Sequence, residues 1–507
     1  MFQLNSYKVG VQLRWLAGNW KDWLKRNVVV MCFTFIYCVA LPQKLALYKI
    51  ALWYSAQVCL IKYLWREKSK KPLVCTNRVK RMLATYAALI VATVAAILRV
   101  DDLDKQALCL AAAHMLAPGF VLLANAINMP LERAINRWYI RDAKRMLREH
   151  PGLNVIGVTG SYGKTSTKFY LHKLLSLRYN VLMTPENYNT TLGVVRTIRE
   201  NLKPFHEVFV CEMGARNVGD VKEICDIVRP EHGVITSIGP QHLESFKTPD
   251  NVTRTKFELA DALPDSGVAF LNRNSEPVRV ELERRRKNEK SARKVVTYGL
   301  SDSFESCGYQ ARDVRVSGEG TSFSVRFPDA SEMAFETRLI GAHNVENVLA
   351  AIAVADFMGV PRGDIAVGVR RLEGVPHRLQ LIRGGSTLII DDAYNSNAAG
   401  AKAALDVLAM FDGCKILVTP GMVELGNRED ELHEKFGAQA GAVCNFVVLV
   451  GKRRTKSILR GLTDTGYPEN RIFVAKDLNE GLARVAAIDA SGMQKVVLLE
   501  NDLPDNY

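Results

Sequence analysis

Apolar residues form two long uninterrupted runs in the first third of the chain. Residues 82–98 read MLATYAALIVATVAAIL and residues 107–129 read ALCLAAAHMLAPGFVLLANAINM, and neither run contains Asp, Glu, Lys or Arg. Because a helix needs about 20 apolar residues to cross a bilayer core, the second run fits a membrane span well and the first run only just does. Two shorter apolar stretches, residues 27–41 and 45–61, predict a second hairpin or a re-entrant or interfacial element.

Charge gives these runs an orientation. Residues 1–150 hold 23 Lys and Arg against 8 Asp and Glu, whereas the other 357 residues hold 44 against 45. A strongly basic segment is typical of nucleic-acid or membrane-surface binding, and the adjacent apolar runs favour the membrane over any nucleic-acid partner. Basic residues flank both outer ends of the two long runs, so the positive-inside rule places those ends in the cytoplasm. The alternative is that the runs are buried helices of a soluble domain.

We therefore predict that residues 1–130 are a membrane anchor of two to four spans in contact with membrane lipid. The protein would be a multi-pass protein of the cell membrane, with its remaining residues in the cytoplasm. Residues 131–150 predict a basic amphipathic helix at the membrane surface, or otherwise an ordinary linker helix. The ten cysteines show no CxxC pair and no metal-ligand spacing, which indicates reduced thiols.

Beyond residue 150 the pattern changes to short apolar strands that alternate with helical stretches. The segment 154–167 reads NVIGVTGSYGKTST and predicts a buried strand, a turn and a helix, which is the setting of a nucleotide phosphate site. Gly160 and Gly163 let backbone N–H groups point at phosphate oxygens, and the helix N-terminus adds partial positive charge. Lys164 can bridge the β- and γ-phosphates of ATP, and the Thr165 hydroxyl can hold Mg²⁺.

The alternation continues to the C-terminus and predicts a doubly wound domain there. The expected fold class is α/β, with a helical transmembrane N-terminal segment, a P-loop central domain over residues 151–378 and a Rossmann-like domain over residues 379–507. The strands expected in the last domain are residues 387–390, 415–418, 446–450, 472–474 and 495–499.

From residue 152 to residue 499 the chain resembles the Mur ligases, and most closely the type that adds D-alanyl-D-alanine. Several motifs stand in the family's order, which is far more specific than any one of them. They are TGSYGKTS at the ATP loop, TPENYNTTLG (184–193), VFVCEMGA (208–215), SIGPQHLE (237–244), TRTKFE (253–258), GAHNVENVLAA (341–351), GVPHR (374–378), LIIDDAYNSN (388–397) and VTPGMVELG (418–426).

The resemblance implies a role for each matching position. The implied catalytic residues are Lys164, Glu212, His242, Lys256 and Arg378. Two Mg²⁺ sites are implied, with Thr165, Glu212, His242 and Lys256 as ligands, the lysine as a carbamate. The implied nucleotide-binding residues are Gly160, Ser161, Gly163, Lys164, Thr165, Ser166, His343, Asn344, Asn347, Arg378, Asp392, Tyr394 and Asn395. The implied substrate-binding residues are Asn187, Asn189 and Asn397.

The chain departs from the family's pattern at two places. The membrane segment stands where the family has a separate domain that holds a UDP-sugar. Near the end, where the family has Lys-Gly-Ser, residues 499–503 read LENDL. This change reverses the charge where the family handles its incoming amine, so the identities of both substrates stay open.

The resemblance implies an ATP-dependent amide ligase of cell-wall biosynthesis that works through an acyl phosphate. It would join an amino acid or dipeptide, best D-alanyl-D-alanine, to the carboxylate of a muropeptide-like small molecule or lipid-linked peptide. Other cell-wall enzymes are further partners that the resemblance implies. The alternatives are a polyglutamate- or folate-type glutamate ligase, a P-loop transport ATPase, or a membrane scaffold with an inactive ligase domain.

Overall fold

The computed structural model divides the chain into two compact units, which are described separately. One contains Met1–Trp138 and the other is Tyr139–Leu503. The structure describes Gln3, Tyr7 and residues 9–21, 73–186, 188–239, 243–287, 294–300, 308–394, 397–423, 425 and 428–501. The predicted apolar stretches 27–41 and 45–61 lie outside these residues.

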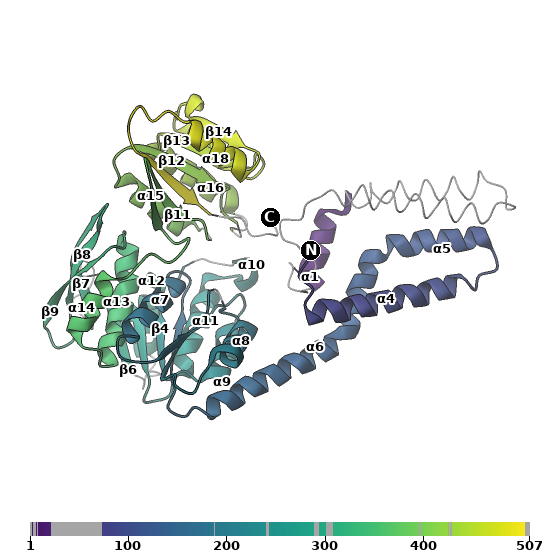
Figure 1. Ribbon diagram of the computed structural model, residues 1–507, viewed down its shortest axis with the longest axis horizontal. Helices are drawn as coiled ribbons and strands as arrows, with labels where there is room; N and C mark the ends of the chain where they lie inside the picture. Colours follow the sequence, from purple (N-terminus) through teal and green to yellow (C-terminus); the bar gives the residue numbers. More distant parts are fainter. Residues whose placement is uncertain are drawn as a thin grey trace. The chain divides into compact units, whose positions relative to one another are not determined.

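The N-terminal unit is helical where it is described (Figure 1). Its helices are α1 (Val9–Gly18), α4 (Asn77–Ile97), α5 (Leu103–Met115) and α6 (Ala117–Arg148), the last of which continues into the second unit. Within the described residues, only α4 is by itself long and apolar enough to cross a membrane. Leu108–Met115 and α6 pass the same test together, but they are bent by 62°.

In the structure, the first apolar run therefore fits a membrane span better than the second, which is the opposite of the expectation from sequence. The first run lies in the continuous 21-residue helix α4, whereas the second is divided between α5 and α6. Pro118 accounts for the break, because proline has no N–H for a helical hydrogen bond and is tolerated mainly in a first turn. The predicted helix over residues 131–150 is the second half of α6, which includes Pro130 without ending there.

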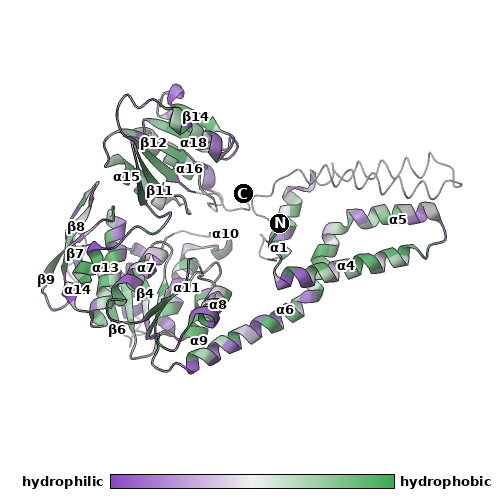
Figure 2. Ribbon diagram, in the orientation of Figure 1, coloured by the Kyte–Doolittle hydropathy of each residue, from purple (hydrophilic) through white to green (hydrophobic). Residues whose placement is uncertain are grey.

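Two polar contacts join α4 to α6 in this unit. Arg81 Nε lies 2.7 Å from Glu132 Oε1, and Asn128 Nδ2 donates to Thr85 Oγ1 at 2.9 Å. The two pairs lie about one turn apart on each helix, so they fix a register between α4 and α6. Most of the rest of α4 is apolar (Figure 2).

The second unit begins with the last turns of α6, which are part of its core. Ala143 is fully buried there, and Tyr139, Ile140 and Met146 pack against the same cluster. Asp142 adds an ion pair with Arg199 at 2.8 Å.

The central domain is built on a sheet with the order β2-β3-β1-β4-β5-β6-β7-β8-β9 in the described residues. The strands from β2 to β7 pair in parallel, and β7, β8 and β9 pair antiparallel. The parallel strands are short runs rich in Val, Ile and Phe, as expected for strands buried on both faces. The bounds are β1 Asn154–Thr159, β2 Val181–Met183, β3 Val208–Glu212, β4 His232–Ile235, β5 Val268–Asn272, β6 Lys294–Leu300, β7 Tyr309–Ser317, β8 Gly320–Arg326 and β9 Glu332–Thr337.

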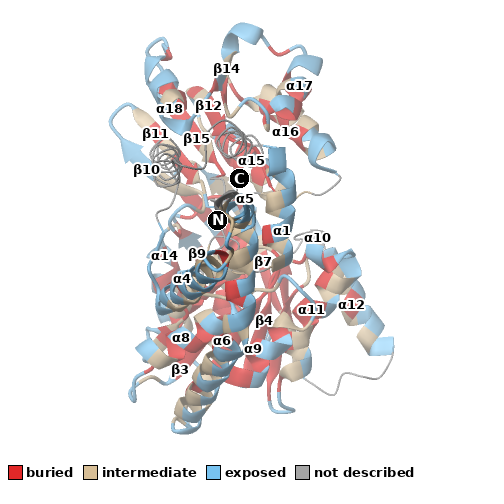
Figure 3. Ribbon diagram, turned by 90° about the vertical axis from the view of Figure 1, so that its right-hand side faces the viewer, coloured by how far each residue is buried: buried red, intermediate tan, exposed pale blue. Residues whose placement is uncertain are grey.

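Helices cover both faces of this sheet and enclose two apolar cores, so that the strands are buried between them (Figure 3). One core contains α7 (Lys164–Leu175), α13 (Ala342–Phe357) and α14 (Arg362–Arg370). The other contains α8 (Thr191–Asn201), α9 (Asp220–Val228), α11 (Pro249–Ala262) and α12 (Glu276–Lys287). The short helix α10 spans Leu243–Phe246.

The C-terminal domain has a second sheet with the order β10-β11-β15-β12-β13-β14 in the described residues. Only β10 is antiparallel to its neighbour, and helices lie on both faces. All five strands expected from the sequence are present, which confirms the α/β class. The elements are β10 Gln380–Gly384, β11 Thr387–Asp392, α15 Ala398–Ala409, β12 Cys414–Thr419, α16 Glu429–Val443, β13 Phe446–Val450, α17 Lys456–Asp464, the 3-10 turn η4 Glu469–Arg471, β14 Ile472–Ala475, α18 Leu478–Ala487 and β15 Lys495–Glu500.

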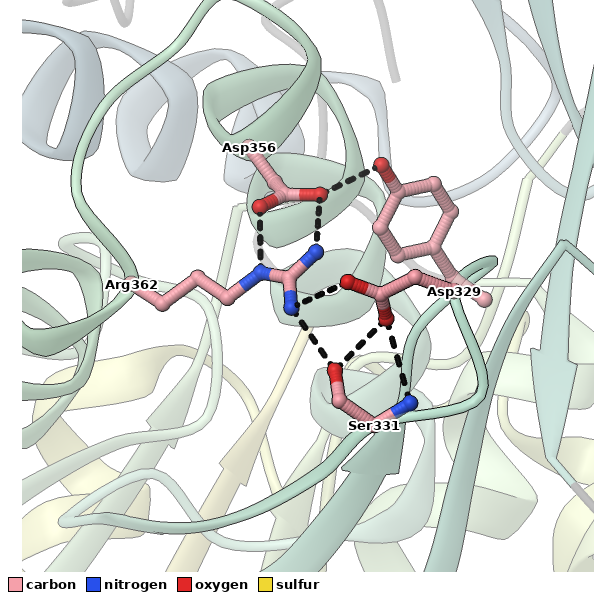
Figure 4. Close-up of polar contacts among 5 residues, drawn as sticks. Asp329, Ser331, Asp356 and Arg362 are labelled. Atoms are coloured by element: carbon pink, nitrogen blue, oxygen red, sulfur yellow. Dashed lines mark hydrogen bonds and ion pairs between the residues drawn. The ribbon is translucent and has the colours of Figure 1, made fainter.

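A polar cluster fastens the β8–β9 turn to the C-terminal end of α13 (Figure 4). Arg362 donates to Asp356 at 2.7 Å, to Asp329 at 2.9 Å and to Ser331 at 2.7 Å. Its guanidinium also lies 3.9 Å from the centre of the Phe327 ring. Since α13 begins beside the phosphate loop, this cluster helps to hold one wall of the candidate site.

We expect Arg362→Ala to lower the free energy of unfolding of the central domain by about 2 kcal/mol, because its hydrogen bonds to Asp356, Asp329 and Ser331 and its packing on Phe327 are lost together. Pulse proteolysis in urea measures this. Arg370→Ala is the matched control, since Arg370 lies 3.6 Å from Glu336 with both side chains largely exposed. Its effect should stay below about 0.5 kcal/mol. Equal effects of the two substitutions would contradict this account of the cluster.

Candidate nucleotide and metal site

The predicted phosphate loop joins β1 to α7 and is closed by tight backbone contacts. The N–H groups of Ser161 and Tyr162 donate to the Ser237 carbonyl at 2.8 and 3.1 Å. The Thr236 hydroxyl donates to the Tyr162 carbonyl at 2.6 Å. Ser161 is buried, and its hydroxyl donates to the Gly239 carbonyl, so this side chain supports the loop from within.

The two glycines of the loop are required by its shape. Gly160 has φ 150° and Gly163 has φ 79°. A Cβ atom would lie 1.9 Å from Thr236 Oγ1 at Gly160 and 2.2 Å from Asn347 Oδ1 at Gly163. The chain therefore passes closer to its neighbours than any side chain permits.

Lys164 is the first residue of α7 and folds back over the loop. Its Nζ donates to the Ser161 carbonyl at 2.9 Å. Burial lowers the pKa of Lys164 to about 8, against the opposing effect of Glu212. The amine therefore lies against the phosphate loop, and the negative charge of bound phosphates would raise its pKa again.

Glu212 ends β3 next to this loop and is almost fully buried. Its Oε1 accepts hydrogen bonds from Thr165 Oγ1 at 3.1 Å and from Asn189 Nδ2 at 2.9 Å. Its Oε2 lies 3.0 Å from Lys168 Nζ, but it accepts no well-directed hydrogen bond. Burial would raise the pKa of Glu212, yet the nearby Lys168 and Lys164 lower it overall, so the carboxylate is ionised.

This arrangement fits a Mg²⁺ ion. Mg²⁺ prefers oxygen ligands and is commonly bound by one or two protein groups together with phosphates. Thr165 and Glu212 present a hydroxyl and an incompletely bonded carboxylate oxygen beside the phosphate loop. In the described part of the chain, His, Cys, Asp and Glu side chains form no group of three that could hold a metal.

Lys256 lies on α11, and only 2% of its surface is exposed. Burial lowers its pKa to about 7, and Lys164 adds to this effect. A large part of this amine is therefore neutral at physiological pH, which is the form that can add carbon dioxide to give a carbamate. Glu258 in the same motif accepts from the N–H groups of Gly219 and Lys222 and so caps the start of α9.

The start of α13 supplies the far wall of the loop. Asn347 Oδ1 accepts from Thr167 Oγ1 at 3.2 Å and lies against Gly163. Burial lowers the pKa of His343 to about 4, so its ring is neutral. Asn344 is buried, and its amide joins the Tyr170 hydroxyl to the Ile340 carbonyl. It therefore orders the helix pair α7 and α13 from within the core.

The segment that joins the central and C-terminal domains is a candidate hinge, and it carries two residues in the left-handed region, His377 at φ 59° and Leu379 at φ 49°. Between them, the Arg378 guanidinium lies 4.3 Å from the centre of the Tyr394 ring. Burial raises the pKa of Asp392 to about 6, although Arg378 opposes the shift. The structure thus brings these three predicted residues together at the end of β11.

Five other predicted residues stand apart from this picture. Asn397 Oδ1 accepts from the Gly400 N–H at the start of α15, which is a helix-capping role. Ser166 lies in the first turn of α7 and is partly exposed. Asn187, His242 and Asn395 lie outside the described residues, so their roles stay predictions.

Sequence reasoning missed three polar residues beside the loop, namely Lys168, Asn272 and Glu346. Asn272 ends β5 and donates to Glu346 Oε2 at 2.7 Å. Since parallel strands bring their carboxyl ends to one edge, a polar residue that ends a strand was the available signal for Asn272. For Lys168, the available signal was its position on the apolar face of the predicted helix, where a lysine indicates a buried charge with a partner.

The fold explains part of the departure from the family's pattern at residues 499–503. Glu500 ends β15 fully buried, and its Oε2 accepts from Thr419 Oγ1 at 3.0 Å. Asn501 Nδ2 donates to the Gly421 carbonyl at 2.5 Å. These residues fasten β15 to the end of β12 and the loop after it. The carboxylate of Glu500 therefore makes a contact within the C-terminal domain.

The fold and site define a protein with two α/β domains, the first of which carries a phosphate-type loop between β1 and α7. The Mur ligase middle domain matches residues 158–355, and the Mur ligase glutamate ligase domain matches residues 377–500. The UDP-N-acetylmuramoyl-tripeptide–D-alanyl-D-alanine ligase of Escherichia coli (strain K12) is 30% identical over 341 residues, which are 66% of this chain and 73% of that protein. The chain belongs to the Mur ligase family.

Two further similarities agree with this assignment. The same ligase of Bacillus subtilis (strain 168) is 34% identical over 299 residues. These residues cover 58% of this chain and 62% of that relative's length, so the chain spans less than two thirds of it. The MurF ligase of Thermotoga maritima in complex with ADP superposes with a TM-score of 0.61 at 26% identity, over 72% of this chain and 80% of that one.

We expect Gly163→Ala to weaken the binding of a non-hydrolysable ATP analogue by at least about tenfold, because the added Cβ forces Asn347 and the loop apart. Isothermal titration calorimetry measures the affinity. Gly219→Ala is the matched control, since Gly219 also precedes a helix at φ 94° but has no atom within 4 Å of its Cβ position. If both substitutions left the affinity unchanged, the loop would not be the phosphate site.

Proposed function

We propose that this protein is an ATP-dependent amide ligase that forms its product through an acyl phosphate. Its proposed substrates are D-alanyl-D-alanine and the free carboxylate of a muramoyl-peptide acceptor. The single observation that carries the proposal is the cluster of Lys164, Thr165 and Glu212 at a glycine-shaped phosphate loop, with the neutralisable amine of Lys256 nearby. The Escherichia coli and Bacillus subtilis ligases named for this activity are similar to this chain over 66% and 58% of its length.

The proposed chemistry has two steps. An oxygen of the acceptor carboxylate attacks the γ-phosphorus of ATP, the bond to the bridging oxygen breaks, and ADP leaves. The amine nitrogen of the second substrate then attacks the acyl carbon, the phosphate leaves with the attacking oxygen, and the nitrogen loses a proton. Such transfer depends on alignment and on neutralisation of charge.

The chain supplies both requirements. Backbone N–H groups of the loop and the N-terminus of α7 orient the phosphates, and Lys164 and Arg378 offset their charge. A Mg²⁺ ion bound by Thr165 and Glu212, with carbamylated Lys256 and His242 at a second site, would neutralise further phosphate charge. The hinge at Arg378 allows the C-terminal domain to close and exclude water, which would otherwise hydrolyse the acyl phosphate.

Both the central and the C-terminal domain match ligase families, so nothing favours the alternative of a P-loop transport ATPase. A glutamate ligase on the same scaffold differs only in its substrates, so the choice of amine separates it from the proposal. The departure at residues 499–503 makes this choice the most informative test.

We predict that the detergent-solubilised chain releases ADP from Mg-ATP only when a muramoyl-tripeptide acceptor and D-alanyl-D-alanine are both present. Lys164→Met should lower the rate at least about a hundredfold, because a charged contact to the transferred phosphate is lost. Lys173→Met, an exposed lysine of the same helix, should leave the rate unchanged. Turnover with glutamate in place of the dipeptide would contradict the proposed substrate.

Lys256 gives a second prediction. Because the carbamate would require carbon dioxide, removal of bicarbonate and carbon dioxide should lower the rate of the unaltered protein, and their return should restore it. Lys256→Ala should lower the rate at least about a hundredfold, with no response to bicarbonate. Full activity of Lys256→Ala would exclude the carbamate.

We further propose that the N-terminal unit anchors the ligase in the cell membrane, with the catalytic domains in the cytoplasm. In support, α4 is long and apolar, only 6% of its apolar window is buried among the described residues, and basic residues flank it. The anchor suggests a lipid-linked acceptor. Such an acceptor should be used faster than its soluble UDP-linked form in mixed micelles. A faster UDP-linked substrate, or release of the chain from membranes by alkaline carbonate, would contradict this proposal.

A further inference from the structure

Lys168 is a buried lysine that the proposed chemistry does not use. It lies on α7 one turn beyond Lys164, and its side chain has no exposed surface. Its Nζ lies 3.0 Å from Glu212 Oε2 and donates to the Glu186 carbonyl at 2.5 Å. Lys168 therefore contacts the carboxylate that would bind metal.

The pairing has an electrostatic consequence for that carboxylate. A buried carboxylate without a partner is strongly disfavoured, and a buried ammonium beside it compensates its charge. The Lys168–Glu212 pair is neutral as a whole. A divalent cation that approaches Glu212 alone thus meets a ligand whose charge is already balanced, with an ammonium 3.0 Å from one of its oxygens.

The pairing also has a geometric consequence. Lys168 binds the carbonyl of Glu186, and Asn189 of the same loop donates to the other oxygen of Glu212 at 2.9 Å. The Gly214 N–H donates back to the Asn189 carbonyl at 2.7 Å. Glu212, Glu186 and Asn189 are therefore held as one assembly, in which Lys168 supplies the charged contact.

We propose that Lys168 is a positioning residue that holds Glu212 as a balanced ion pair, so that the site binds a divalent cation appreciably only together with a nucleotide. The triphosphate supplies the negative charge that the Lys168–Glu212 pair lacks. This inference rests on the proposed function, because it takes the loop as a nucleotide site and Glu212 as a metal ligand. It goes beyond that function because it makes the binding of the divalent cation depend on the bound nucleotide.

The test is a titration of the full-length, detergent-solubilised protein with Mn²⁺, which substitutes for Mg²⁺ and whose free form is counted by electron paramagnetic resonance. Each protein is titrated without nucleotide and with a non-hydrolysable ATP analogue. The unaltered chain should bind Mn²⁺ at least about tenfold more tightly with the analogue than without it. Without nucleotide, Lys168→Met should bind Mn²⁺ at least about tenfold more tightly than the unaltered chain does.

Three further variants make the result specific. Lys168→Arg keeps the charge and should behave like the unaltered chain. Lys168→Met combined with Glu212→Gln should lose the gained affinity, because the carboxylate that binds the metal is gone. Lys173→Met removes an exposed lysine from the same helix and should change nothing.

A merely structural role for Lys168 predicts the opposite sign, since a distorted site binds metal more weakly. If Lys168→Met does not fold, Lys168→Gln is titrated in its place, since it removes the charge but keeps a hydrogen-bond donor. Nucleotide-free affinities within twofold of the unaltered chain, or below it, would overturn the inference and leave the proposed function intact. Failure of the unaltered chain to bind Mn²⁺ with the analogue would overturn both.

Discussion

The buried carboxylate of Glu212 is the constraint around which the site is organised. A charge in this position must be compensated, and Lys168 and Thr165 of α7 and Asn189 of a distant loop do so. The compensation fixes how close α7 lies to β3. Because Lys164 is the first residue of α7, its position at the phosphate loop is fixed as well. This position determines where phosphates can bind. The parallel sheet makes this possible, because it brings the carboxyl ends of β1, β3, β4 and β5 to one edge.

Local patterns predicted the fold well, and contacts between distant residues were the part that they missed. The strand–loop–helix of residues 154–167 could be found because its glycines and Lys164 are adjacent in sequence. Asn344 was predicted to bind nucleotide, yet its amide is used in the core, since the packing of α13 on α7 is not visible in a motif. Lys168 was missed for the same reason. The break in the second apolar run was foreseeable from Pro118, which the hydropathy pattern alone ignores.

The two departures from the family's pattern have different physical meanings. At residues 499–503, the buried contacts of Glu500 and Asn501 connect strand ends within the C-terminal domain, so the change is part of that domain's own packing. The basic, apolar N-terminal unit has no such internal explanation, because most of α4 lacks a covering surface among the described residues. A ligase that works on a membrane-bound acceptor would account for it, and the phosphate site needs no alteration for that role.

The proposed ligase mechanism requires that an acceptor carboxylate be activated by phosphoryl transfer at the loop over residues 160–165. The most direct measurement follows ¹⁸O from that carboxylate. The acceptor is labelled in its free carboxylate, and the phosphate released during amide formation is analysed by mass spectrometry. The account predicts that each phosphate carries one labelled oxygen, which was the attacking atom. Unlabelled phosphate would show that water receives the phosphoryl group, and it would contradict the ligase mechanism.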